Sequence, residues 1–195
     1  METLQRMKEL AKTALSKRKR QDGTPDFFHA WRVTQILTEA LQSSGECTDE
    51  EELLSLRCGA LGHDLLEDTD TTEEEIIDVA GNKTLQYIKY LTNAFGDDKT
   101  APYVAQIEKA PEEAKLLKLA DLTDNLLHGS FSVRVLGLPW MHSFFLPIVD
   151  PMLKMLQNAG FERYPKTAEF LLRSATLARA HLAESMRAAE TETAP

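Results

Sequence analysis

The sequence predicts an all-α protein, folded as a single helical bundle. Apolar residues recur at the three- and four-residue spacing of amphipathic helices along most of the chain. No segment shows a convincing run of the alternating apolar and polar residues that indicates a strand. The 195 residues fit one domain, and 43% are hydrophobic, enough to form a buried core. We therefore expect one domain over residues 1–185 and a frayed tail over residues 186–195.

The N-terminal half is expected to begin with two helices. Apolar residues at helical spacing predict the first over residues 4–15, and the turn-forming residues 22–25 should separate it from the next. The second helix is predicted over about residues 26–41 and ends at the Ser-Ser-Gly run over residues 43–45.

The next helices are indicated by their capping residues. Thr48, with Glu51 three residues later, has the pattern of a capping box and predicts a helix running toward His63. Thr71 or Thr72 is expected to cap a short helix over residues 73–80. Asn82 is a candidate cap for a further helix over residues 83–92.

The C-terminal half is expected to be helical after one polar loop. The loop is predicted over residues 93–102, and Pro111 is typical of the first position of a helix. The helix that follows, over residues 112–127, is rich in leucine and should be largely buried. Two more helices are expected near residues 140–158 and 163–185.

The net charge of −9 is concentrated in one segment. Between Glu46 and Glu75 there are twelve acidic residues and one basic residue, Arg57, which leaves 19 acidic and 21 basic residues elsewhere. An acidic chain repels a phosphate backbone, so we expect no nucleic-acid partner. Most of these acids are interpreted as solvated helix ends.

Cysteine content and hydropathy indicate a cytoplasmic protein with no membrane partner. Cys47 and Cys58 have no metal-binding spacing, as expected for a reduced compartment. The N-terminus lacks the apolar run of a signal peptide. The most apolar stretch, residues 131–149, contains Arg134 and is interpreted as core rather than as a membrane span.

One short acidic run is a candidate for chemistry. His63, Asp64, Glu67 and Asp68 place four ionisable groups within six residues, next to apolar neighbours. On a helix, His63 and Glu67 share one face, and Asp64 and Asp68 share a neighbouring face. Carboxylates this close repel one another unless a positive charge lies among them, and a divalent metal would supply it. A solvated acidic face is the alternative.

Three further residues extend this candidate site. Asp121 lies in an apolar helix with Asn125 one turn later, and His29 lies among aromatic residues. A salt-bridged helix acid and a core histidine are the alternative interpretations. Together with His63 and Asp64 they offer nitrogen and oxygen donors without a thiolate, a set that suits manganese, iron, magnesium or zinc.

These residues resemble a known family. An isolated histidine, a His-Asp pair and a distant aspartate form the signature of HD-domain metal phosphohydrolases. The segments GTPDFFH, ALGHDLLEDTDTTEEEI, DDKT and AKLLKLADLTDNL resemble the small stand-alone RelA/SpoT-type hydrolases over about residues 15–128. The resemblance implies an all-α fold, one divalent metal, usually manganese, and hydrolysis of a small nucleotide. In the best-known members of this family the substrate is (p)ppGpp, which loses its 3′-diphosphate to give GDP or GTP.

The resemblance also implies roles for individual residues. Glu67 and Asp68 match the catalytic pair that acts on the attacking water. The implied metal ligands are His29, His63, Asp64 and Asp121, and the implied substrate-binding residues are Arg18, Lys19, Lys99 and Asn125.

The chain also departs from the family. Leu126 stands where relatives often have arginine, and the helix near residues 139–152 lacks their nucleotide-binding arginine and tyrosine. Base recognition therefore stays open, with (p)ppApp and the 2′-phosphate of NADPH as alternative substrates. Another HD activity, such as a 5′-nucleotidase or a cyclic-nucleotide phosphodiesterase, and a non-catalytic nucleotide sensor are further alternatives. The sequence does not predict an oligomeric state.

Overall fold

The computed structural model describes residues 2–96 and 100–192, which form helices and contain no strand beyond an isolated bridge between Lys19 and Pro25. The helices are α1 (Glu2–Leu15), α2 (Phe27–Ser44), α3 (Glu50–Gly62), α4 (Leu65–Asp68), α5 (Glu73–Leu91), α6 (Thr100–Glu108), α7 (Glu112–Trp140), the π-helical turn η1 (Met141–Phe145), α8 (Leu146–Asn158) and α9 (Pro165–Glu192). The prediction of an all-α fold is confirmed.

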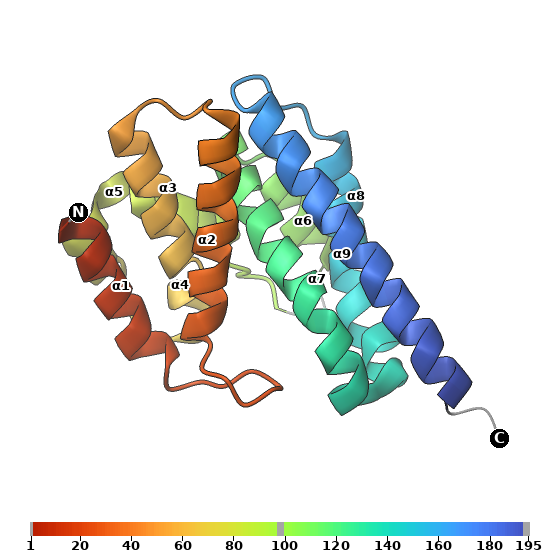
Figure 1. Cartoon of the computed structure of the whole chain (residues 1–195). Helices are drawn as coiled ribbons and strands as arrows, with labels where there is room; N and C mark the ends of the chain where they lie inside the picture. Colours follow the sequence, from red (N-terminus) through yellow and green to blue (C-terminus); the bar gives the residue numbers. More distant parts are fainter. Residues whose placement is uncertain (1, 97–99, 193–195) are drawn as a thin grey trace.

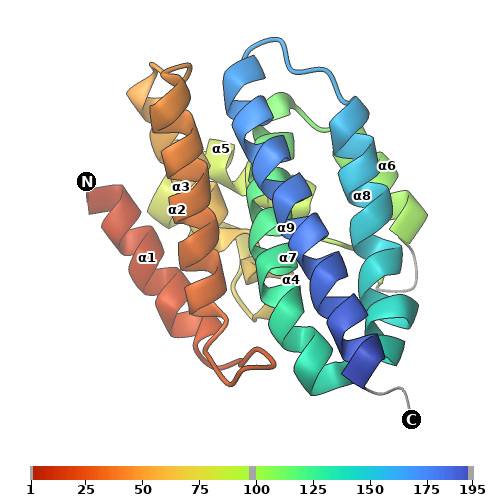
Figure 2. The ribbon, with the colours of Figure 1, turned by 45° about the vertical axis from the view of Figure 1, so that its right-hand side comes forward.

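Helix α7 is the central element of the bundle. It packs along α9 and also contacts α2, α3 and α5 (Figure 1). Helices α1 and α3 lie on one side of α2, while α6 and α8 lie on the other side of α7 (Figure 2). The arrangement places α7 next to the N-terminal ends of α2 and the C-terminal end of α3, where the predicted histidines lie.

The buried side chains form two clusters that meet along α2 and α3. The larger cluster extends from these helices to α9, and the smaller one lies beneath α1. Ala30 of α2 and Leu61 of α3 belong to the smaller cluster, whereas Val33 and Ala60 belong to the larger one. The backbone of α2 and α3 next to the predicted site is therefore packed against both apolar clusters.

The capping residues are partly as predicted. Asp49, not Thr48, caps α3, because its extended backbone lets its carboxylate accept two backbone N–H groups of the first turn. Thr72 caps α5 and forms a capping box with Glu75. The break expected between two helices after residue 80 is a kink at Gly81, with φ of 81°.

The C-terminal helix is longer than the sequence indicates. Helix α9 continues to Glu192, so residues 186–192 of the expected tail are helical. Met186 explains the continuation, because its side chain is buried against the larger cluster. Helix α6 begins at Thr100, inside the predicted loop, and α7 runs on to Trp140 beyond the predicted end of that helix.

The apolar stretch over residues 131–149 is only partly core. Met141 and Val149 are buried, whereas Phe131, Val135 and Phe144 are exposed. The stretch comprises the end of α7, η1 and the start of α8, which lie at one end of the bundle (Figure 1). By length and composition alone the helical segment Glu112–Asn158 could cross a membrane, a property that it shares with the core helices of many globular proteins.

Candidate metal centre

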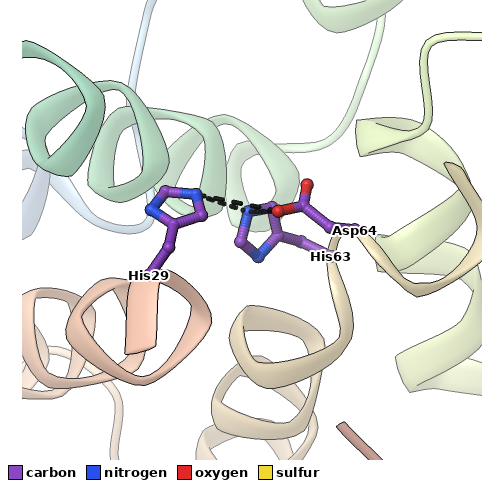
Figure 3. A group of neighbouring side chains, drawn as sticks. All are labelled: His29, His63 and Asp64. Atoms are coloured by element: carbon purple, nitrogen blue, oxygen red, sulfur yellow. Dashed lines mark hydrogen bonds and ion pairs between the residues drawn. The ribbon is translucent and has the colours of Figure 1, made fainter. Parts of the chain in front are cut away.

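Two histidines face each other between α2 and α3. His29 lies in the first turn of α2, and His63 directly follows α3 (Figure 3). Gly62, the last residue of α3, packs closely against α1 and α5, because a Cβ atom there would overlap Cε of Met7 and lie 2.8 Å from Cδ1 of Ile88. Asp64 follows at the start of α4 and points toward both rings. The end of α3 is thus packed closely enough to fix where the His-Asp pair lies.

Four donor atoms converge from α2, α7 and the segment between α3 and α4. Nε2 of His63 lies 3.2 Å from Nε2 of His29 and 3.1 Å from Oδ2 of Asp64. Oδ1 of Asp121 lies 3.1 Å from Nε2 of His29 and 3.6 Å from Nε2 of His63. Ligands about 2.1 Å from one ion lie about 3.0–3.4 Å apart. His29, His63 and Asp64 therefore form a site that can hold a divalent metal, and Asp121 lies beside it.

The far side of each imidazole ring is held by an acceptor. Nδ1 of His29 donates to Oδ2 of Asp124 over 2.6 Å, and Nδ1 of His63 donates to the carbonyl oxygen of Ala60 over 2.9 Å. A proton on Nδ1 leaves the Nε2 lone pair directed at the centre of the site. Two lone pairs and two carboxylate oxygens then meet, an arrangement that a bound cation would stabilise.

The electrostatics show the same need for positive charge. Burial would lower the pKa of His63, but the charge of Asp64 and a hydrogen bond to Asp121 raise it well above its ordinary value. Burial also opposes protonation of His29, and hydrogen bonds to Asp121 and Asp124 outweigh it and raise its pKa. The metal-free rings therefore hold protons, which a bound metal would replace.

Asp121 is kept ionised by its neighbours on α7. Its burial would raise its pKa, yet the charge of Lys118 holds that pKa well below its ordinary value. Nζ of Lys118 donates to Oδ2 of Asp121 over 2.7 Å, and Nδ2 of Asn125 donates to Oδ1 over 2.6 Å. Asn125 in turn accepts a hydrogen bond of 2.8 Å from Arg20. Asn125 is therefore in direct contact with Asp121, one of the predicted metal ligands.

The two predicted catalytic acids lie on α4, next to the donor atoms. Burial and the charge of Asp64 raise the pKa of Glu67, although its carboxylate accepts the backbone N–H of Asn93 over 2.8 Å. Burial and Asp64 also raise the pKa of Asp68, which is paired with Arg18. Carboxyls with raised pKa values beside a metal site are suited to proton transfer.

Nine of the ten predicted site residues line one cavity of about 390 Å³. Arg18 and Lys19 lie at its rim, where Arg18 is half exposed and also contacts Asp26. Lys99 lies outside the described residues. Neither Cys47 nor Cys58 lines the cavity, so its described donors are nitrogen and oxygen only.

Sequence reasoning missed three residues that the structure brings to the site. Asp124 joins His29 to Arg32, whose Nε and Nη2 atoms lie 2.7 and 3.0 Å from its carboxylate. Arg20 lines the cavity beside Asn125. Asp124 follows Asp121 by three residues, a spacing that places both on one helix face, and this was the available signal. Nothing in the sequence pairs Arg32 with Asp124, because that contact joins two distant helices.

Fold and site together define a class. The chain has the all-α HD-domain fold, and it carries a candidate divalent-metal centre in a polar cavity at the junction of α2, α3 and α7. No protein-family model matches the chain. A solved structure of a metazoan ortholog of SpoT that hydrolyzes ppGpp and plays a role in starvation responses covers 89% of this chain. That chain is matched over 96% of its length, with a TM-score of 0.66 and 20% identity.

Curated relatives give the particular resemblance. The guanosine-3′,5′-bis(diphosphate) 3′-pyrophosphohydrolase MESH1 of Danio rerio is 39% identical over 112 residues, covering 54% of this chain and 56% of the relative. Its Homo sapiens counterpart is 38% identical over 117 residues, covering 56% and 59%. An Aquifex aeolicus 3′-pyrophosphohydrolase is 32% identical over 131 residues, covering 64% and 17%. The match spans less than two thirds of the length of each of these relatives. The identities confirm the predicted resemblance to small stand-alone ppGpp hydrolases.

Proposed function

We propose that this chain is a metal-dependent phosphohydrolase that removes the 3′-diphosphate of (p)ppGpp, giving GDP or GTP and diphosphate. The observation that carries the proposal is the convergence of His29, His63, Asp64 and Asp121 in a cavity that also holds two acids with raised pKa values. The curated relatives that hydrolyse this nucleotide support it.

Manganese is the metal that we propose for this site. The donors are imidazole nitrogens and carboxylate oxygens, a mixed set without sulfur that suits manganese. Asp121 completes the set with the three residues that can hold a divalent ion. When bound, such an ion polarises a phosphoryl oxygen and lowers the pKa of a water molecule.

Glu67 is proposed as the group that takes the proton of the attacking water. Its raised pKa brings its proton affinity closer to neutral pH, and the Asn93 N–H holds one carboxylate oxygen in place. The water oxygen attacks the phosphorus bonded to O3′ and the bond from that phosphorus to O3′ breaks. The proton taken by Glu67 then passes to O3′, which leaves as the hydroxyl of GDP or GTP. Asp68 is proposed to orient the water beside Glu67.

Cations at the rim of the cavity are proposed to bind the phosphates. Arg18 is paired with Asp68 and Asp26, so an incoming phosphate group would compete with these carboxylates for its guanidinium. Lys19 lines the same rim. Asn125 is proposed to contact the ribose, because its side chain lies between Asp121 and Arg20.

The test is incubation of the purified chain with ppGpp and Mn²⁺, with GDP and diphosphate measured by chromatography. We expect equal amounts of both products, and no release of diphosphate would overturn the proposal. Asp64→Ala should lose metal binding and turnover together. Glu67→Gln should bind Mn²⁺ as the wild type does and lower kcat by about 10²–10⁴-fold. Glu169→Gln, a substitution on the exposed surface of α9, is the control and should change neither.

A further inference from the structure

Two arginines line the cavity of about 390 Å³ that holds the candidate metal centre, and they differ in their partners. Arg18 is paired with Asp26 and Asp68. For Arg20, by contrast, no carboxylate oxygen of the described residues lies within ion-pair distance of the guanidinium. A partly buried cation without a counterion is unfavourable, so Arg20 is suited to bind an anion that enters the cavity.

The guanidinium of Arg20 also has an unsatisfied donor. Nη2 donates to Oδ1 of Asn125 over 2.8 Å, whereas Nε is shielded from solvent and has no hydrogen-bond acceptor among the described residues. A buried N–H group without an acceptor is unfavourable, and native structures satisfy most such groups. Because Arg20 lines the cavity, an oxygen atom of a bound ligand can supply the acceptor.

The loop between α1 and α2 fixes the position of Arg20. The backbone N–H of Arg20 donates to the carbonyl oxygen of Thr24, and its carbonyl oxygen accepts the N–H of Gly23, both over 2.9 Å. Gly23 has a φ of 81°, and Oδ1 of Asp22 accepts the N–H of Thr24 over 2.8 Å. These hydrogen bonds close the loop before any ligand is bound. Binding therefore costs little backbone entropy at Arg20.

Arg20 is separated from a predicted metal ligand by one side chain. Asn125, which accepts from Arg20, donates to Oδ1 of Asp121 over 2.6 Å. Arg20 also lines a neighbouring pocket of about 240 Å³, to which α7, η1 and α8 contribute. A phosphate group held at the candidate metal centre would therefore lie beside the guanidinium. Guanidinium groups bind phosphate oxygens through parallel, charge-assisted hydrogen bonds.

We propose that Arg20 binds a phosphate group of the substrate, a role that the family resemblance does not imply for it. The proposal rests on the proposed function, because it takes a phosphorylated nucleotide as the ligand. Arg18 must leave two carboxylates before it can bind phosphate, whereas Arg20 leaves at most the uncharged acceptor Asn125. Arg20 should therefore contribute more to phosphate affinity than Arg18 does. The phosphate belongs to the 3′-diphosphate or to the 5′ position, and the first experiment distinguishes the two.

The first experiment measures binding to the metal-free protein by isothermal titration calorimetry. Inorganic diphosphate represents the 3′-diphosphate, and GDP carries the 5′-phosphates. Arg20→Gln should weaken at least one of these ligands about 10- to 100-fold, as expected for lost hydrogen bonds to a charged group. Arg20→Lys should restore part of the loss, because it keeps the charge but not the planar donor group. Arg187→Gln replaces an exposed arginine of α9 and is the matched control, which should change neither affinity.

The ligand that Arg20→Gln weakens identifies the phosphate. A loss for GDP alone indicates the 5′ group, a loss for diphosphate alone indicates the 3′ group, and a loss for both indicates a contact shared by the two. If the wild type binds neither ligand, or if Arg20→Gln binds both as the wild type does, the assignment is wrong. Arg18→Gln should weaken the same ligand less than Arg20→Gln does, and a larger loss in Arg18→Gln contradicts the proposal.

The second experiment compares hydrolysis of ppGpp with Mn²⁺. Arg20→Gln should raise KM about 10- to 100-fold. Added salt should raise KM less in this variant than in the wild type, because the variant has lost a charge that salt screens. An equal salt dependence would indicate that Arg20 only supports Asn125, and it would overturn the proposal.

The two proposals can fail separately. If ppGpp is not hydrolysed while Arg20→Gln still weakens GDP or diphosphate, the proposed function fails and the phosphate site stands. If the wild type hydrolyses ppGpp and Arg20→Gln leaves KM unchanged, the proposed function stands and the assignment of Arg20 fails.

Discussion

Asp124 is predicted to position His29 for metal binding, and Asp124→Asn tests this. Its carboxylate accepts Nδ1–H of His29 and two N–H groups of Arg32, and these contacts lower its pKa to about 2 despite its burial. The fall from the ordinary value of 3.8 corresponds to about 2 kcal/mol. Because this pKa is lowered on folding, the stabilisation is complete above about pH 4 and is lost as the pH falls through about 2.

At neutral pH the substitution should therefore remove about 2 kcal/mol of unfolding free energy, measured by urea denaturation. An asparagine amide can also donate to His29 and so reverse which ring nitrogen carries the proton. We expect the dissociation constant for Mn²⁺ to rise about 10- to 100-fold, as for other lost partners of metal-bound histidines. Isothermal titration calorimetry measures this change on the folded protein.

Asp150→Asn provides a matched control. Asp150 accepts Nε and Nη2 of Arg179 at 2.7 and 3.0 Å, the same distances that join Arg32 to Asp124, but this pair links α8 to α9 away from the site. Its loss should cost less than about 1 kcal/mol, since the Asp150 side chain is 44% exposed, and should leave Mn²⁺ affinity unchanged. If Asp124→Asn binds Mn²⁺ as tightly as Asp150→Asn does, Asp124 does not position His29.

Three further predictions follow from the raised histidine pKa values and the packing of α3. Because the pKa values of His29 and His63 are raised above 6.5, Mn²⁺ should release protons at pH 6.5, detected with an indicator dye in weak buffer; binding without proton release would contradict the assignment. The same raised values stabilise the metal-free fold fully below pH 6.5, and this contribution disappears as the pH rises through the folded-state pKa values. The Tm of the metal-free protein should therefore fall over that range and recover with Mn²⁺, and a Tm that does not respond to either would argue against the charge pairing. Gly62→Ala should lower the free energy of unfolding by about 1–3 kcal/mol through overpacking, whereas Gly160→Ala, with open space around the new Cβ, should be neutral. Equal stability of these two alanine variants in urea would refute the close packing at the end of α3.

The fold class was predictable because helical spacing of apolar residues repeats through the whole chain. The exact ends of the helices and the burial of individual segments were harder to predict. Thr48 and Asp49 are both good capping residues, and only the backbone angles at the start of α3 decide between them. Residues 131–149 are apolar enough for a core, but their burial depends on which helices cover them.

The candidate site was predictable where residue type and motif carry the information. His29, His63, Asp64 and Asp121 lie together, as their shared motif indicates. Arg32 and Asp124 escaped notice because their pairing depends on how α2 crosses α7. The pocket of about 240 Å³ beside Asn125 was not predicted from the sequence either. It forms only because the turn at Gly137 brings residues 140–149 back over α7.

The long contact between α7 and α9 has a mechanical consequence. Helix α7 carries four residues of the site. Asp121 is a predicted metal ligand, Lys118 is its ion-pair partner and Asp124 accepts a hydrogen bond from His29. Asn125 lines both the metal cavity and the neighbouring pocket of about 240 Å³. No described residue of α9 lines either cavity, yet a Cβ atom at Gly129 would lie only 3.1 Å from Leu182. Because the two helices pack this closely, the position of α7 depends on that of α9. A shift of α9 would therefore displace the four side chains of α7 together, although α9 itself does not reach the site.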